Sequence, residues 1–162
     1  MGMYIKSEGE GLGDIKKALQ YLKHHKLYIG IPEKETSRQG GDITNVALAF
    51  IHTYGSPKRG IPPRPFLEPG LVTTGALEQI STLMGEAVRA ALKGQQSAAD
   101  SCMTKAGLVG ERAVRDYISA GLSPGLAEST RKAKARKGST ADLPLIDTGS
   151  LLKSITYVIE EA

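Results

Sequence analysis

The spacing of apolar residues along the chain predicts long helices packed on a small sheet. Apolar positions three or four residues apart indicate amphipathic helices, whereas short continuous or alternating apolar runs indicate strands. The helical segments are residues 14–24, 44–55, 67–94 and 98–120, followed by a short helix near 150–153. The strand segments are residues 27–31 and 155–159. This order predicts a single α+β domain over residues 1–162, with long helices packed on a small, mostly antiparallel sheet.

Two of the predicted helices carry residues on which the packing depends. In the helix that ends near Gly55, Val46, Ala47, Phe50 and Ile51 fall on one face. In the last long helix, Gly107 and Gly110 either weaken the first half of the helix or let another helix approach closely.

Segments rich in proline, glycine and charged residues separate these elements. Residues 57–66 contain four prolines, which restrict the backbone and donate no hydrogen bonds, so this segment is predicted to be rigid and extended. Residues 33–42 and 129–142 are polar and lack an apolar period. Both are predicted to be mobile loops, the first of them longer than ordinary connections.

The composition fits one soluble domain. The chain has 162 residues, of which 40% are hydrophobic and only 5% aromatic, so its core must rest mainly on aliphatic side chains. Cys102 is the single cysteine, which excludes an internal disulfide and fits a reducing compartment. No secretory leader pattern is present, and no segment approaches the roughly 18 apolar residues of a membrane span. We therefore expect a soluble, cytoplasmic protein with no membrane partner.

The excess of positive charge is concentrated in one short run. The formal net charge is +4, and five positive charges fall within residues 131–137. They belong to Arg131, Lys132, Lys134, Arg136 and Lys137. This run is either a solvated loop or a contact surface for phosphates or an acidic partner. No aromatic residue is interleaved with the basic ones, so a nucleic-acid contact here would be independent of base sequence and sensitive to salt.

One short motif resembles a catalytic one. Asp147-Thr148-Gly149 matches the active-site loop of aspartic proteases, which need two such carboxylates sharing a proton. The motif also suits a turn, because Asp147 or Thr148 can cap a helix that begins near Ser150 while Gly149 permits a tight bend. We favour the turn and helix cap.

The other reactive side chains do not combine into a site. His24 and His25 are adjacent and project in different directions, and His52 has no acidic or cysteine partner at a metal-like spacing. Cys102 lies on the apolar stripe of a predicted helix, where a small buried side chain is expected. A nucleophile would need a base and an orienting partner, and the sequence nominates neither. We expect no catalytic residue, metal ligand or cofactor, and therefore not an enzyme.

Two passages resemble a family of bacteriophage proteins. The passage Phe50–Ser56 and the Ile61–Leu67 run IPPRPFL that follows it resemble a conserved passage of phage tail-completion and head–tail joining proteins, including virion morphogenesis proteins of Mu-like phages. The run PLIDTGSLLKSI at 144–155 resembles a second passage of the same group. Thr53 departs from the family pattern, in which an acidic residue commonly occupies that position.

The resemblance implies a structural protein that assembles in the bacterial cytoplasm and remains in the virion. It implies a homo-oligomeric ring, six-fold in the family, whose partners are the tail tube and the head–tail connector and whose lumen passes DNA. The alternative is a separate nucleic-acid-binding protein that acts through the basic run at 131–137.

Arg64 and Phe66 are the most informative residues of the first passage. Arg64 stands between prolines, so its guanidinium is held at low entropic cost to meet a carboxylate or a group of carbonyls. That contact lies either within the chain or between subunits. Phe66 is expected to enter the core and anchor the segment.

Overall fold

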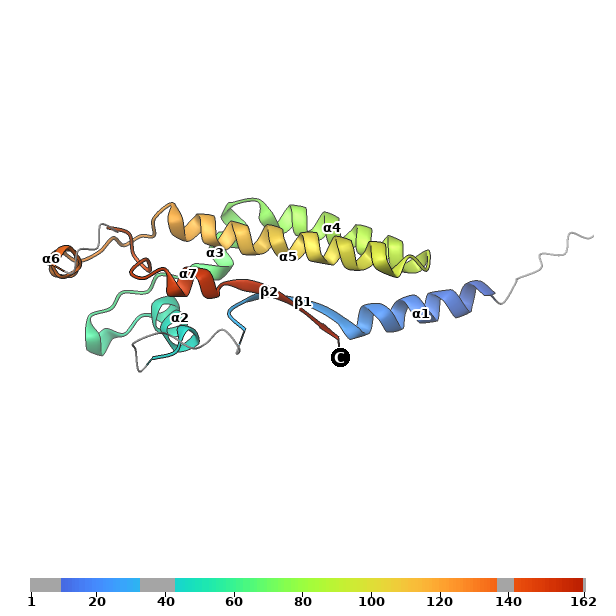
Figure 1. Ribbon diagram of the computed structural model, residues 1–162, viewed down its shortest axis with the longest axis horizontal. Helices are drawn as coiled ribbons and strands as arrows, with labels where there is room; N and C mark the ends of the chain where they lie inside the picture. The colour runs from blue at the N-terminus through green and yellow to red at the C-terminus, as the bar shows by residue number, and fades with distance from the viewer. Residues whose placement is uncertain (1–9, 33–42, 137–141, 162) are drawn as a thin grey trace, which may run out of the picture.

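Two long antiparallel helices, α4 (Ala76–Leu92) and α5 (Gln96–Ser119), form the body of the molecule (Figure 1). The computed structural model describes residues 10–32, 43–136 and 142–161. Mostly small side chains face one another along these helices, which lets the helix axes approach closely. The buried residues of the two helices include Ala87, Ala90 and Ala91 of α4 and Ala99, Met103 and Ala106 of α5. In the part of the chain that the structure describes, no helix is long and apolar enough to cross a bilayer.

The helix predicted at 67–94 is divided into α3 (Leu67–Thr73) and α4. Gly75 has φ 73°, in the left-handed region, and ends the run of helical torsions. Just before it, the hydroxyls of Thr73 and Thr74 donate to the carbonyls of Pro69 and Gly70, each at 2.6 Å. The prediction of one continuous helix was wrong. The apolar spacing continues past Gly75, but the backbone leaves the helical conformation there.

A two-stranded antiparallel sheet lies beside α5 (Figure 1). Strand β1 (His25–Gly30) pairs with β2 (Thr156–Glu161), and Ile29 lies opposite Tyr157. A two-stranded ribbon is marginally stable alone, so its packing on α5 is needed to hold it. The predicted α+β class, with helices packed on a small antiparallel sheet, is confirmed.

Helix α1 (Glu10–His24) leads directly into β1 and packs against α4. It begins earlier than the start predicted at Asp14. The Tyr21 hydroxyl donates a hydrogen bond to the Asp100 carboxylate of α5, and the Tyr21 ring stacks on His25 with the ring centroids 3.9 Å apart. These contacts tie the N-terminal helix to the α4–α5 pair.

The remaining elements gather at the other end of the molecule (Figure 1). They are α2 (Asn45–Tyr54), the short 3-10 helix η2 (Pro57–Arg59) and α7 (Ser150–Ser154). Helix α2 packs against α7 through Asn45 and Ala49, which are buried. Val46 and Phe50, which share the face noted in the sequence, are exposed. The helix is turned this way because small residues allow α7 to approach, and Asn45 hydrogen-bonds Ser150 there at 3.3 Å.

The basic segment forms a helix, α6 (Glu128–Arg136), where a loop over 129–142 was predicted. Alanine, lysine and arginine have high intrinsic helix propensity, and Glu128 pairs with Lys132 one turn later at 2.8 Å. A helix needs no apolar stripe when such residues fill it, which is why periodicity missed α6. The predicted loop at 33–42, and residues 137–141 of the second loop, lie outside the described residues.

Candidate functional site

Helix α6 divides the basic run between an inner and an outer face. Lys134 points inward, and its ammonium donates to the carbonyls of Leu143, at 3.1 Å, and Ile146. Arg131, Lys132 and Arg136 are exposed, and Lys132 is paired with Glu128. Lys137 lies outside the described residues. The run is therefore not one continuous contact surface, because Lys134 instead holds the segment that leads to the 147–149 turn.

An apolar pocket of about 290 Å³ lies between α2, α6 and the 145–151 segment. Its apolar wall is formed by Leu48, Leu126, Ala133, Leu145, Ile146 and Leu151. Six polar or charged residues also line it: His52, Thr130, Lys134, Asp147, Thr148 and Ser150. Of these, Thr130, Asp147 and Thr148 are exposed. A concave apolar surface with a few polar groups at its edge is typical of a binding site for an apolar group.

The Asp147-Thr148-Gly149 turn opens onto this pocket. Gly149 is the N-cap residue of α7 and has φ 76°, so the predicted tight bend at this glycine is present. The Thr148 hydroxyl accepts a hydrogen bond from the Ser150 amide at 3.3 Å. Gly149 occupies the N-cap position and has no capping side chain, so Thr148, one of the two predicted caps, meets the first amide of α7 from one residue earlier in the chain.

Arg64 is bound inside the molecule. Its side chain is only 6% exposed, its Nε donates to the Pro124 carbonyl at 2.6 Å, and its Nη2 donates to the Gly125 carbonyl at 2.8 Å. The contact partner is a pair of carbonyls, one of the two kinds expected from the sequence, and it lies within the same chain. Arg64 therefore joins the proline-rich segment to the loop that follows α5.

Phe66 is 0% exposed and lies in a core cluster with Val114 and Ile118 of α5. The same cluster contains Leu151 of α7 and Ile155, which follows it. Phe66 thus enters the core, as expected, and lies at the centre of the packing between α3, α5 and α7.

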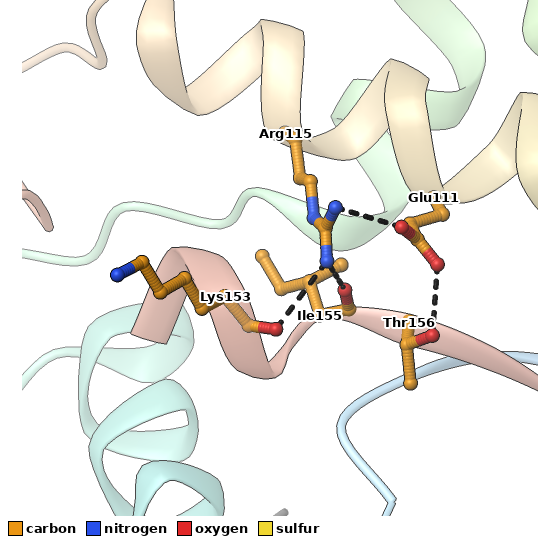
Figure 2. Close-up of polar contacts among 5 residues, drawn as sticks. All are labelled: Glu111, Arg115, Lys153, Ile155 and Thr156. Carbon is orange, nitrogen blue, oxygen red and sulfur yellow. Dashed lines mark hydrogen bonds and ion pairs between the residues drawn. The ribbon is translucent and has the colours of Figure 1, made fainter. Parts of the chain in front are cut away.

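A polar network that the sequence did not predict joins α5 to the start of β2 (Figure 2). The Arg115 guanidinium donates to the Ile155 carbonyl at 2.7 Å and to the Lys153 carbonyl at 3.3 Å. It also pairs with Glu111 at 2.7 Å, and Glu111 accepts from the Thr156 hydroxyl at 2.8 Å. The spacing of Glu111 and Arg115, four residues apart on a helix, was the available signal. The network satisfies the carbonyls at the end of α7 and so positions β2.

An exposed apolar ridge runs along α2. Val46, Phe50 and Tyr54 follow one another at intervals of four residues, so they share one face of the helix. Phe50 is 64% and Tyr54 68% exposed, and their ring centroids lie 4.7 Å apart. We call these three residues the α2 ridge. A helix with aromatic residues four apart and no charged residue was the sequence signal for it.

The histidines and the cysteine do not converge on a metal site. His24 ends α1, His25 begins β1, and His52 lies on α2 beside the pocket. Cys102 is half-buried beside the α4–α5 core, with its Sγ 4.0 Å from a Glu86 carboxylate oxygen. Among the described residues, no three His, Cys, Asp or Glu side chains are grouped closely enough to hold a metal ion.

No protein-family model, curated protein or solved structure matches this chain. Its function must therefore be inferred from its own residues and geometry.

Proposed function

We propose that this chain is a structural assembly protein of a long-tailed bacteriophage or prophage, which completes the tail or joins it to the head as an oligomeric ring. Its subunits assemble in the bacterial cytoplasm and stay in the virion. The ring, six-fold by the family resemblance, meets the tail tube on one side and the head–tail connector on the other.

One observation carries this proposal: the two passages that resemble the phage family share a single core. Phe66 of the first passage lies in one buried cluster with Leu151 and Ile155 of the second. The first passage is also closed on itself, because the Arg64 amide donates to the His52 carbonyl at 2.6 Å. Both passages therefore contribute to one core, which is compatible with the joint structural role that the resemblance implies.

The chemistry of the surface also favours assembly over catalysis. The buried polar residues in the described part of the chain are Asn45, Arg64 and Ser154, and all three hydrogen-bond other groups of the protein. Among the exposed features are an apolar ridge and a basic helix face, and such features serve protein contacts and phosphate contacts respectively.

Deletion of the gene from the phage or prophage that carries it tests the proposal. We expect lysates with filled heads and unattached or unfinished tails under the electron microscope, and recovery of joined virions when the gene is supplied from a plasmid. Mass spectrometry of purified virions should detect the protein. Normal, infectious virions after the deletion would refute the proposal.

A second candidate is a nucleic-acid-binding protein that acts alone. The observation in its favour is the outer face of α6, where Arg131, Lys132 and Arg136 are exposed on one short helix. Under this alternative the protein should bind DNA strongly without forming a ring. Neighbouring genes for capsid, tail tube and tape-measure proteins would argue against it.

A further inference from the structure

The pocket between α2, α6 and the 145–151 segment has a size that suits an amino-acid side chain. Its volume of about 290 Å³ lies at the lower end of the range for ligand pockets, which favours one or two apolar side chains over a large cofactor. Leu48, Leu126 and Leu145 line it from three different parts of the chain. Ala133, on the α6 side, is exposed, so an apolar side chain of another molecule can enter from solvent.

Helix α6 places an arginine on each side of this pocket. Thr130, Ala133 and Lys134 line the pocket, so they mark the face of α6 that is turned toward it. Successive residues of a helix are about 100° apart, so Arg131 is rotated from Thr130 by about 100° in one direction and Arg136 by about 120° in the other. Both arginines are exposed, and neither forms an ion pair with another described residue. Two guanidiniums are thus available beside the pocket.

The other charges near the pocket leave this excess of positive charge in place. Lys132 lies on the far face of α6 and is paired with Glu128 at 2.8 Å, so these two charges offset each other. Lys134 adds a cation to the lining, and Asp147 is the acidic residue among those that line the pocket. An acidic partner segment therefore matches the α6 side of the pocket, which is the side away from Asp147.

We propose that this pocket binds an apolar side chain from an acidic segment of a partner protein, and that carboxylates on either side of that side chain meet Arg131 and Arg136. Arginine forms bidentate hydrogen bonds with carboxylates, and clusters of arginine are a recurring means of recognising acidic motifs. The apolar side chain supplies the burial, and the arginines supply the selectivity. The partner is a neighbouring protein of the particle, so the inference rests on the proposed function for the source of the segment.

A flexible segment fits this site better than a folded surface does. One pocket and two arginines form a site much smaller than the roughly 800 Å² that each partner buries in a standard interface. A short motif with one apolar anchor needs no more than this, because it is recognised through few side chains. We expect weak and salt-sensitive binding, since the arginine contacts are exposed to solvent.

Fluorescence anisotropy with three labelled probes tests the proposal on the purified chain. Each probe is a nonapeptide with a central phenylalanine, and the two residues on either side of it are all aspartate, all serine or all lysine. We expect the aspartate probe to bind at least about fivefold more tightly than the serine probe at low salt, and the lysine probe to bind most weakly. Raising the salt concentration should reduce this preference.

A substitution that fills the pocket shows whether the phenylalanine enters it. Ala133→Phe should weaken binding of the aspartate probe at least about fivefold, because the new ring occupies the space that the probe needs. Ala135→Phe is the matched control, since Ala135 is also an exposed alanine of α6 but lies about 140° around the helix from Thr130. Ala135→Phe should bind the aspartate probe as the parent chain does.

Substitutions of charged residues show whether the arginines read the acidic residues. Arg131→Gln and Arg136→Gln should each weaken binding of the aspartate probe about threefold, the effect of losing one exposed ion pair. Asp147→Asn should have the opposite effect and strengthen it, because a like charge is removed from the lining. Lys132→Gln is the control on the far face of α6 and should change binding by less than about twofold.

The inference is overturned if the chain binds none of the three probes, or binds the serine or lysine probe as tightly as the aspartate probe. It is also overturned if Ala133→Phe and Ala135→Phe bind alike, because the probe would then lie on the outer face of α6. The comparison of the probes uses the parent chain alone, so it decides the matter even where a variant fails to fold. The proposed function is judged separately, by the heads and tails that accumulate when the gene is deleted.

Discussion

Arg64 is a buried, charged residue whose position is fixed by its neighbours. The flanking prolines restrict the backbone, and the guanidinium then meets two carbonyls in a loop about 60 residues away in sequence. A planar guanidinium donates to both acceptors through two N–H groups whose relative positions are fixed, whereas the donors of an ammonium lie on a single nitrogen at the end of a flexible stem. Arg64 therefore joins the proline-rich segment to the loop after α5, and neither segment is held to the other by a helix or a sheet.

Replacing Arg64 should lower the stability of the fold. We expect Arg64→Ala to lower the free energy of unfolding by about 2–4 kcal/mol, because two charge-assisted hydrogen bonds are lost and two carbonyls are left without their donor. Arg64→Lys should recover only part of this loss. Urea denaturation measures both effects, with Arg59→Ala as the exposed control that should change stability by less than about 0.5 kcal/mol. If Arg64→Ala lowered the free energy of unfolding by as little as the control does, Arg64 would not be joining the two segments as described.

Tyr21 should give the protein a stability that falls in alkaline solution. Burial and the hydrogen bond to Asp100 raise the pKa of Tyr21 above its usual value of 10.0. Below pH 10 the phenol is protonated in both the folded and the unfolded chain, so it adds no pH dependence. Above pH 10 the unfolded chain loses this proton more readily than the folded chain, so the free energy of unfolding decreases as the pH rises.

The comparison of Tyr21→Phe with the parent chain between pH 8 and pH 11 measures this effect. The variant should be less stable at pH 8, because the Asp100 hydrogen bond is lost, and the difference between the two proteins should shrink as the pH rises past 10. Tyr54→Phe is the control, since Tyr54 is 68% exposed. A difference that stays constant over this range would refute the linkage.

At the scale of elements, the close contact between α5 and the sheet depends on two glycines. A Cβ on Gly107 would lie 2.3 Å from the Tyr157 ring of β2, and one on Gly110 would lie 2.2 Å from Ile29 of β1. From the sequence, these glycines either weaken the helix or let another helix approach closely. The nearest neighbour at both positions is the sheet, and at Gly110 the Ile80 side chain of α4 also approaches, to 3.3 Å from the added Cβ.

Gly107→Ala should therefore destabilise the protein although alanine favours a helix. We expect a loss of about 1–3 kcal/mol, the usual cost of overpacking, because the aromatic ring has to move. Gly85→Ala on α4 is the matched control: its Cβ would meet only an Arg89 side-chain nitrogen at 3.5 Å, and helix propensity should then raise stability by up to about 1 kcal/mol. Thermal unfolding of both variants checks the prediction. Equal changes of the midpoint temperature in the two variants would contradict it.

The elements also differ in how well local sequence predicts them. Helices α4 and α5 and both strands follow their apolar spacing, since each buries one face or stripe. Helix α6 lacks such a stripe and is supported by propensity and by the Glu128–Lys132 pair. Helix α2 has an apolar stripe, but it packs through Asn45 and Ala49, because the surface of α7 that it meets requires small side chains.

At the scale of the whole molecule, the basic surface separates the two candidate functions. Among the described residues of the basic run, Arg131, Lys132 and Arg136 are exposed and can contact DNA, whereas Lys134 is engaged by the Leu143 and Ile146 carbonyls. Replacing these three by glutamine removes the outer charge of α6, keeps a residue of high helix propensity at each position and leaves Lys134 in place.

We expect this triple variant to keep the oligomeric state of the parent chain. Both proteins should bind duplex DNA only weakly, with dissociation constants of about 10⁻⁶–10⁻⁴ M at physiological salt. Fluorescence anisotropy at several salt concentrations measures the affinity and its salt dependence. Tight binding by the parent, lost in the variant together with about three units of salt slope, would instead favour the nucleic-acid-binding alternative.

By itself, the sequence determined the α+β class, the approximate helices and strands and the burial of Phe66. Apolar periodicity and the character of single residues carry that information, and both are local. Only the tertiary structure decided that Arg64 meets Pro124 and Gly125, that Lys134 turns inward and that the α2 ridge faces outward. Each of these depends on which distant segments come into contact and how much room their side chains leave, and no local pattern encodes that.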